Sequence, residues 1–277
     1  MNTAVYPFTL IFDGVYARFP YIFEGNPVYT TGEKSGSGKI APSCFISGRS
    51  AGDMAFSLSS FNKNREEFFR LLKIQPENVY SLAQVHSRDV YTLNPSMEGT
   101  LPSPGIFARE GDGMVSYSSN AFLSVTVADC LPVFLLDTEN GWFAVLHSGW
   151  KGTGIVSNAV EIMQKAGSRP QALAAVLGPC IQSCCYRVDT ERAKLFNDEF
   201  GCASPHCGDS KEFPLGNVVQ KKKSWYINLQ AANARLLAAA GVKHIAYCTD
   251  CTYTDTRLGS FRREGSHAYT RMIALVG

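Results

Sequence analysis

The chain has 277 residues, of which 45% are hydrophobic and 18% are charged, and its formal net charge is +2. This composition is typical of a globular protein with a sizeable core, and the near-neutral charge leaves no basic surface for nucleic acid. No segment has the ~20 apolar residues of a membrane helix, and residues 1–5 lack the pattern of a signal peptide, so we expect a cytoplasmic protein without membrane contact.

We expect one domain that covers residues 1–277. The N-terminal part alternates short apolar runs with turn residues, and residues 31–38 form a flexible loop by composition. No comparable linker and no internal repeat follows in the sequence. A chain of this length fits a single large domain.

A capping pattern predicts the first helix, over residues 65–73. Asn64 fits the N-cap position, and Glu67 follows three residues later, as in a capping box. The apolar residues of the segment then fall on one helical face. Residues 78–85 alternate as a strand does, which places His86 at a strand end.

Two runs of strand-forming residues flank a turn in the middle of the chain. They cover residues 122–128 and 133–136. Pro132 between them lacks a backbone donor and restricts the residue before it to extended conformations. We therefore expect Cys130 at a bend or a strand edge.

A further strand over residues 142–146 ends at His147 and leads into a glycine-rich turn at residues 149–154. The amphipathic segment after the turn predicts a helix, whose free N-terminal amides could bind an anion. Lys151 within the turn favours a phosphate-bearing or other anionic ligand. The glycine spacing matches neither the P-loop nor the dinucleotide-binding motif, so a simple strand-to-helix turn is the alternative.

The later segments add two strands and a helix. Residues 172–177 and 242–248 predict strands, and residues 229–240 form an amphipathic helix that Gly241 ends. Strands and helices follow one another in irregular order. This order favours an α+β (mixed α/β) protein with mixed sheets and outer helices.

Three residues with ligand or nucleophile chemistry recur at predicted strand ends: His86, Cys130 and His147. Each alone is more often a structural residue, but strand ends of one sheet can converge on a single cleft. Two imidazoles and one thiolate would hold Zn²⁺ with an open fourth position, as in catalytic zinc sites. The same groups could instead form a metal-free nucleophile pair, with Cys130 attacking and His147 as the base.

The remaining cysteines give weaker signals. The chain has nine cysteines, an odd number, and in a reducing compartment they are better interpreted as buried small residues, ligands or nucleophiles than as disulfides. Cys184 and Cys185 are adjacent, and adjacent cysteines rarely bridge each other. Cys248 and Cys251 have CxxC spacing, but a zinc site would need further ligands. The nearby candidates for such ligands, which lack a matching motif, are Cys202, His206 and Cys207.

Several segments resemble, in order, the signatures of the bacterial laccase-like multicopper polyphenol oxidase family, also called the purine nucleoside phosphorylase or peptidoglycan-editing-factor family. These segments are residues 84–86, 126–133, 147–153, 177–181, 251–254 and 260–264. The resemblance is strongest over residues 64–277. It implies a four-layer α/β/β/α sandwich with mixed sheets in a single domain.

The resemblance also implies an activity. The family's metal and catalytic residues fall on His86, Cys130 and His147, with Zn²⁺ as the expected ion and copper as the alternative. Family members are described as cleaving adenosine, inosine and methylthioadenosine with phosphate, as deaminating adenosine, and as oxidising polyphenols with copper. We therefore expect a purine nucleoside and phosphate as ligands. Five histidines are too few for the cluster of a true multicopper oxidase.

Further site residues are implied by the resemblance and by their chemistry. Asp112 resembles a family aspartate, and we expect Asp112 or Asp129 to transfer protons or to orient a histidine ring. Lys151, Arg262 and Arg263 are the candidates for binding phosphate, although Arg263 could equally form a structural ion pair. Lys151 stands where the family has arginine, so its contact with phosphate would be that of a point charge.

Three other functions stay open from the sequence. One is a metal-free Cys–His hydrolase or amidase that acts on a peptidoglycan precursor. Another is a copper-dependent polyphenol oxidase, and the third is a protein that binds a ligand without turning it over. The sequence carries no indication of the oligomeric state.

Overall fold

Two large β-sheets lie at the centre of the protein. The structure, a computed structural model, describes residues 3–19, 21–23, 26–28, 42–56, 62–93, 109–201, 218–221 and 224–277. None of the helices within these ranges is long and apolar enough to cross a membrane. The loop expected at residues 31–38 and the stretch that contains Cys202, His206 and Cys207 lie outside the described residues.

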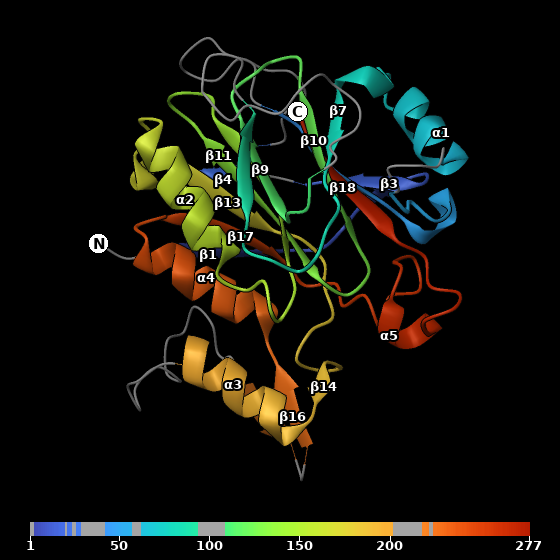
Figure 1. Cartoon of the computed structure of the whole chain (residues 1–277), viewed down its shortest axis with the longest axis vertical. Helices are drawn as coiled ribbons and strands as arrows, with labels where there is room; N and C mark the ends of the chain where they lie inside the picture. Colours follow the sequence, from blue (N-terminus) through green and yellow to red (C-terminus); the bar gives the residue numbers. More distant parts are fainter. Residues whose placement is uncertain are drawn as a thin grey trace.

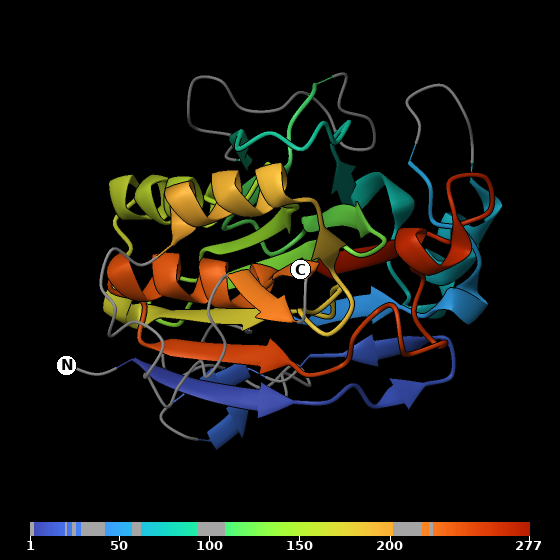
Figure 2. The ribbon, with the colours of Figure 1, turned by 90° about the horizontal axis from the view of Figure 1, so that it is seen from below.

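The larger sheet has seven strands and is mixed. Its strand order is β1 (Ala4–Phe8), β17 (His244–Cys248), β13 (Leu173–Leu177), β11 (Leu131–Asp137), β12 (Phe143–Ser148), β9 (Gly113–Ser116) and β8 (Val90–Leu93). β17 is parallel to both of its neighbours, β8 is parallel to β9, and the other pairs are antiparallel. Figure 2 shows β1 (dark blue) beside β17 (orange), so distant parts of the sequence meet at this edge.

The smaller sheet has six strands and faces the larger one. Its strand order is β2 (Phe12–Asp13), β3 (Tyr16–Arg18), β6 (Cys44–Ser47), β18 (Met272–Val276), β10 (Phe122–Val127) and β7 (Val79–Ser81). Only β7 and β10 pair in parallel among these strands. β18 therefore lies inside the sheet, between two strands that come much earlier in the sequence.

Helices cover the outer face of each sheet. α2 (Ile155–Lys165) and α4 (Leu229–Ala239) pack on the larger sheet, and α1 (Lys63–Leu71) packs on the smaller sheet at the opposite side (Figure 1). Three groups of buried apolar side chains result, one beneath α2 and α4, one between the two sheets, and one beneath α1. The four-layer α/β/β/α sandwich expected from the sequence is thereby confirmed.

The strand β11 shows how one strand serves two of these cores. Its residues Leu131, Val133 and Leu135 face α2 and α4, whereas Phe134 and Leu136 face the smaller sheet. Successive side chains of a strand point to opposite faces, so a strand between two apolar layers must be apolar throughout. This explains why the segment is a continuous hydrophobic run rather than an alternating one.

Shorter elements complete the molecule. β14 (Arg187–Val188), β16 (Ser224–Ile227) and β15 (Val218–Lys221) form a small sheet, and β4 (Tyr21–Phe23) pairs with β5 (Asn26–Val28). Figure 1 shows α3 (Thr190–Phe200) with β14 and β16 at one end of the sandwich. Ala193 and Phe196 of α3 extend the core beneath α2 and α4. The short helix α5 (Phe261–Glu264) precedes β18.

The first helix begins earlier than the capping pattern predicted. α1 starts at Lys63, and its N-cap is Asn62 rather than Asn64. The Asn62 side chain accepts hydrogen bonds from the amides of Asn64 (3.0 Å) and Arg65 (3.3 Å). It also donates to the carbonyls of residues 53 and 55, at 3.0 and 2.8 Å. These contacts with a preceding loop, which no local pattern reveals, select the first of the two asparagines.

Strand boundaries near the candidate residues also differ from expectation. β7 ends at Ser81, so the strand predicted over residues 78–85 is too long and His86 lies in the loop that follows. β12 continues to Ser148, so His147 lies within the strand rather than after it. Cys130 directly precedes β11, at a bend, as predicted. The later predictions hold to within two residues for β13, α4 and β17.

Candidate active site

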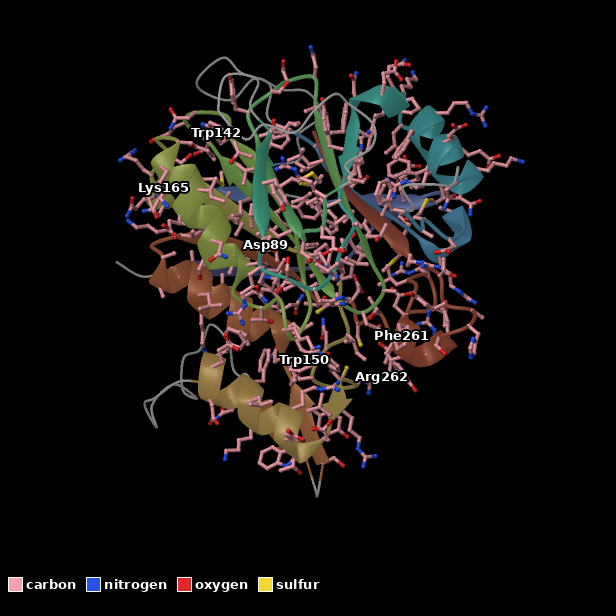
Figure 3. The ribbon with its side chains drawn as sticks, viewed as in Figure 1. Asp89, Trp142, Trp150, Lys165, Phe261 and Arg262 are labelled. Carbon is pink, nitrogen blue, oxygen red and sulfur yellow. The ribbon has the colours of Figure 1, made fainter. Side chains whose placement is uncertain are left out.

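A cavity of about 730 Å³ contains the three residues singled out from the sequence. It lies where strand ends of the sandwich meet α3 and α5. Figure 3 labels Trp150, Phe261 and Arg262, three of the residues that line it, near this end of the molecule.

The fold brings His86, Cys130 and His147 together. One donor atom from each residue lies within 4.8 Å of the other two. The imidazole rings of His86 and His147 have centroids 4.8 Å apart and planes inclined at 72°. His147 is buried, Cys130 is half-buried and His86 is exposed, so the cluster is reachable from the cavity.

Asp112 fixes the positions of both histidines through hydrogen bonds. It is fully buried immediately before β9, and its carboxylate lies 2.6 Å from Nδ1 of His147. The same carboxylate accepts the backbone amides of Val85, His86 and Ser87, at 3.1, 3.0 and 2.7 Å. Because Asp112 engages Nδ1 of His147, Nε2 is the nitrogen left to face Cys130 or a metal ion.

Asp129 fixes the segment that precedes Cys130. Its carboxylate accepts the hydroxyl of Thr252 and the backbone amide of Arg262, both at 2.6 Å. One donor therefore occupies each carboxylate oxygen, which favours a positioning role for Asp129 over proton transfer. These contacts also tie the strand β11 to the segment between β17 and α5.

Two residues of the site have strained backbones. His86 has a φ of 62° and Asp129 a φ of 86°, in the left-handed region that favours glycine. Residues other than glycine adopt this region at a cost of roughly 1–2 kcal/mol each. The amide hydrogen bonds to Asp112 hold His86 in place, and the side-chain bonds of Asp129 hold the second position. Strain of this kind is concentrated at functional sites.

Cys130 and His147 form an ionised pair in the metal-free site. Burial alone would raise the pKa of Cys130, but the charge of His147 and hydrogen bonds from both imidazoles lower it from 9.0 to about 6. Burial alone would lower the pKa of His147, but the Cys130 thiolate and the bond to Asp112 raise it from 6.5 to about 9. At pH values between these two pKa values, the site holds a thiolate beside an imidazolium. Because the two groups interact strongly, each titration step reflects both residues.

The glycine-rich turn packs tightly against the site. A Cβ atom added at Gly149 would lie 3.0 Å from both Cys130 Sγ and His86 Cδ2. One added at Gly152 would lie 2.8 Å from the carbonyl oxygen of Ser87. Glycine is needed here because the turn and the His86 loop approach each other so closely. This favours the strand-to-helix turn over the anion site considered from the sequence.

Two of the expected phosphate ligands do not reach the cavity. Lys151 is exposed, with its Nζ 5.6 Å from the centre of the Trp150 ring, and it does not line the cavity. Arg263 does not line it either. Its guanidinium donates to the carbonyls of residues 252, 253 and 255 and forms an ion pair with Glu264 at 2.6 Å. Arg263 is therefore the structural ion-pair residue of the alternative interpretation.

Three other guanidinium groups line the cavity, and only Arg262 was expected. Arg192 comes from α3, and its Cζ lies 4.7 Å from the centre of the Trp150 ring. Arg271 lies just before β18 and pairs with Asp53, with 2.8 Å between Nη2 and Oδ2. These side chains bring three guanidinium groups to this end of the sandwich, and Asp53 offsets the charge of Arg271.

Aromatic side chains line much of the remaining cavity wall. They are Phe56, Trp150, Tyr186, Phe261 and Tyr269. Sequence reasoning missed these residues and two of the arginines because they come from separate segments that meet only in the folded protein. Two of them could have been found from the sequence, because Trp150 and Phe261 lie inside segments that resemble family signatures.

The donor set fits a borderline or soft metal ion. Two imidazoles and one thiol whose donor atoms lie within 4.8 Å of one another match zinc sites, in which the ligand distances are about 2.0–2.3 Å. The same three ligands also suit a single copper ion. Within the described ranges no further histidine joins this group, so these residues provide no ligands for a trinuclear copper cluster.

Comparison with known sequences places the chain among established relatives. A family described as multi-copper polyphenol oxidoreductase laccase matches residues 47–277. A purine nucleoside phosphorylase from Corynebacterium glutamicum is 27% identical over 206 residues, covering 73% of this chain and 76% of the relative. One from Deinococcus radiodurans is 29% identical over 218 residues, covering 78% and 76%. An adenosine deaminase from an unknown prokaryotic organism is 32% identical over 158 residues, covering 53% and 56%.

A solved structure shares the fold. The crystal structure of YlmD from Geobacillus stearothermophilus superposes with a TM-score of 0.76 and covers 97% of this chain and 98% of that chain. The sequence identity is 23%, so this similarity establishes the common architecture and nothing further. The sequence match begins at residue 47, somewhat earlier than the region of strongest resemblance expected from the sequence.

Proposed function

Because this chain belongs to the multi-copper polyphenol oxidoreductase laccase family, we propose that it is a metal-dependent purine nucleoside enzyme. It cleaves adenosine, inosine and methylthioadenosine with phosphate, and it also deaminates adenosine. The observation that carries the proposal is the accessible group of His86, Cys130 and His147 in a cavity lined by arginines and aromatic rings. Relatives named purine nucleoside phosphorylase and adenosine deaminase support it.

The cavity offers groups suited to both substrates of phosphorolysis. In this reaction a phosphate oxygen bonds to C1′ of the ribose while the C1′–N9 bond breaks. The bonding pair leaves with the purine, which takes up a proton from solvent. Arg192 and Arg262 supply positive charge and donors for phosphate, and the aromatic rings supply surfaces on which a purine stacks.

Deamination replaces the amino group of adenosine by oxygen, as water adds to C6 and ammonia leaves. His86, Cys130 and His147 would hold Zn²⁺, with copper as the alternative ion. When bound, the ion supplies Lewis acidity, which lowers the pKa of water to about 7. Asp112 keeps Nδ1 of His147 engaged, so that Nε2 is presented as the ligand. Asp129 holds the backbone beside Cys130 in the conformation that brings its thiol to the site.

A metal-free hydrolase is the second candidate, because the Cys130 thiolate, His147 and Asp112 form a nucleophile, base and orienting carboxylate. In this reaction the Cys130 sulfur bonds to a carbonyl carbon of an amide. The C–N bond then breaks, and the imidazolium of His147 gives its proton to the leaving amine. Water afterwards releases the acyl group from the sulfur.

One experiment separates these functions. Purified protein of measured metal content is incubated with a panel of purine nucleosides, with and without phosphate, and the products are followed chromatographically. We expect free base and ribose 1-phosphate only when phosphate is present, and inosine from adenosine in either case. Chelation should stop deamination. If no purine nucleoside yields base or inosine, the nucleoside proposal fails, and amide cleavage by metal-free protein would establish the hydrolase.

A substitution at Arg192 tests whether phosphate binds beside the arginines that line the cavity. Arg192→Ala removes a guanidinium that lines the cavity, so the KM for phosphate should rise while the KM for the nucleoside changes little. Lys151→Ala is the matched control, because that ammonium lies outside the cavity. Equal effects of the two substitutions would show that phosphate does not bind at Arg192.

A further inference from the structure

Three cysteines outside the cavity converge on one another. Cys184 and Cys185 lie in the turn that precedes β14, and Cys251 lies just after β17. Their sulfur atoms all lie within 4.8 Å of one another, and no disulfide joins any of the three. None of them lines the cavity described above. The described residues thus contain a second cluster of ligand-type side chains, apart from His86, Cys130 and His147.

The backbone is built to hold this arrangement. The amides of Cys185 and Tyr186 donate to the carbonyl of Gln182, at 2.9 and 2.8 Å, which closes the turn that carries the two adjacent cysteines. An isolated backbone β-bridge between Cys251 and Cys180 fixes Cys251 to the same region. The amide of Gln182 lies 3.5 Å from the sulfur of Cys251. These contacts therefore hold the turn that carries Cys184 and Cys185 against the segment that carries Cys251.

The surroundings of the sulfurs suit thiolates that share a cation. Burial alone would raise the pKa of Cys251, but backbone amides of residues 182, 253 and 254 point at its sulfur and lower the pKa overall. The pKa of Cys184 is raised to about 12 by burial and by its neighbouring thiols. Three thiols this close cannot ionise together without a compensating positive charge, which a metal ion provides as it displaces their protons.

We propose that Cys184, Cys185 and Cys251 form a second metal site, which binds a thiophilic d¹⁰ cation, Zn²⁺ or Cu⁺, through three thiolates. Soft sulfur ligands select these ions over harder ones. With metal–sulfur distances of about 2.3 Å, a planar three-coordinate site places sulfurs about 4.0 Å apart, which is compatible with three sulfurs that lie within 4.8 Å of one another. Cys184 is exposed, which gives an ion a route of entry and leaves room for a fourth ligand from solvent.

This site does not depend on the nucleoside chemistry. It is defined by sulfur ligands alone, and its occupancy can be measured in protein that has lost the first site. Cys248, which shares the CxxC spacing with Cys251, does not belong to the cluster, and its thiol donates to the Asp250 carboxylate at 3.4 Å. The CxxC spacing therefore misidentifies the partner of Cys251, whose partners lie more than sixty residues away at positions 184 and 185.

The test uses the full chain with the first site removed by His86→Ala and Cys130→Ala. Reduced, metal-free protein is dialysed without oxygen against Zn²⁺ in one arm and Cu⁺ in the other, and bound metal is counted per chain. We expect one ion per chain in at least one arm, and none after Cys184→Ser and Cys185→Ser are added. Cys44→Ala, which removes a buried thiol elsewhere, is the matched control and should keep the ion.

Two outcomes overturn the proposal: no binding in either arm, or binding that survives both serine substitutions. Circular dichroism establishes that each variant is folded. A second measurement needs no further substitution. Co²⁺ added to the variant without the first site should give strong thiolate-to-cobalt absorption in the near ultraviolet, and its absence would also contradict a three-thiolate site.

Discussion

Asp112 positions two histidines of the site with one carboxylate, and it does so in different ways. It fixes the ring of His147 through a side-chain contact, and it fixes the backbone of His86 through three successive amides. All of these groups are donors, so only an acceptor with two free oxygens satisfies them. The carboxylate is fully buried, and its pKa is lowered by these donors although burial opposes that shift.

Asp112→Asn should weaken metal binding by about 10–100-fold, because the amide NH₂ would face a backbone donor and release either the ring or the loop. The measurement is competitive titration of metal-free protein with a Zn²⁺ indicator. Asp137→Asn is the matched control, since Asp137 is also buried and accepts backbone amides, at residues 139 and 140 away from the site. Equal zinc affinity in wild type and Asp112→Asn would exclude the orienting role.

The Cys130 thiol of metal-free protein should react with iodoacetamide at neutral pH, because its pKa is lowered to about 6. As pH falls through this value the thiolate is protonated, so the alkylation rate at Cys130 should drop. Above it the rate should stay level, whereas an ordinary thiol would keep gaining reactivity up to about pH 9. Mass spectrometry of the modified peptide across a pH series gives the rate.

His147→Ala removes the neighbouring positive charge and should move this titration of Cys130 to higher pH. Zn²⁺ should protect the thiol in wild type. A Cys130 that titrates near pH 9 in both proteins would show that the ionised pair does not form.

At the scale of elements, the sequence predicts those parts whose signal is local. The helix α2 has an apolar stripe with helical period, α4 is a run of strong helix formers that Gly241 ends, and the bend at Cys130 follows from Pro132. His86, Cys130 and His147 stand out because ligand-type side chains recur at successive predicted strand ends. The helix α3 is mostly polar and buries only Ala193 and Phe196, so no run of apolar residues predicts it, yet it supplies Arg192 to the cavity.

The features that could not be predicted from the sequence depend on contacts between distant segments. Arg263 and Arg262 are adjacent and chemically alike, but only the fold decides that one serves backbone carbonyls while the other reaches the cavity. The pairing of Arg271 with Asp53 spans 218 residues and is invisible to any local pattern. Likewise, Asn62 rather than Asn64 caps α1 because of a loop that packs against it.

Gly149→Ala should reduce catalytic activity and metal affinity with little loss of stability, because the new methyl group would push Cys130 and His86 apart. Zinc titration and thermal unfolding, measured together, separate the two effects. Gly167→Ala is the control: its methyl group meets open space, but its positive φ costs roughly 1–2 kcal/mol. The control should therefore lose stability and keep zinc. If Gly149→Ala binds zinc as wild type does, the close approach is not needed for the site.

At the scale of the whole molecule, both sheets are assembled from strands far apart in the sequence. β1 pairs with β17, and the contact continues where the amide of Thr249 donates to the carbonyl of Phe8 at 2.8 Å. Tyr6 and Phe8 pack against the core between the sheets. β1 therefore covers the edge of β17, the strand that leads to Cys251 and to Thr252.

Removal of residues 1–8 should lower the free energy of unfolding by about 2–4 kcal/mol, because two aromatic side chains leave the core and β17 becomes an exposed edge. Urea unfolding followed by tryptophan fluorescence measures the change. Ile11→Ser, at an exposed position nearby, should have almost no effect. A truncated protein as stable as the wild type would mean that β17 does not need its partner.

The central position of β18 has a consequence for how the protein is made. The smaller sheet joins β6 to β10 only through residues 272–276, so neither half of that sheet has its partner until this segment has left the ribosome. Phe261, Arg262, Tyr269 and Arg271 are synthesised just before it. During translation, the two halves of the smaller sheet therefore stay unjoined until β18 emerges, and the cavity cannot be complete before then.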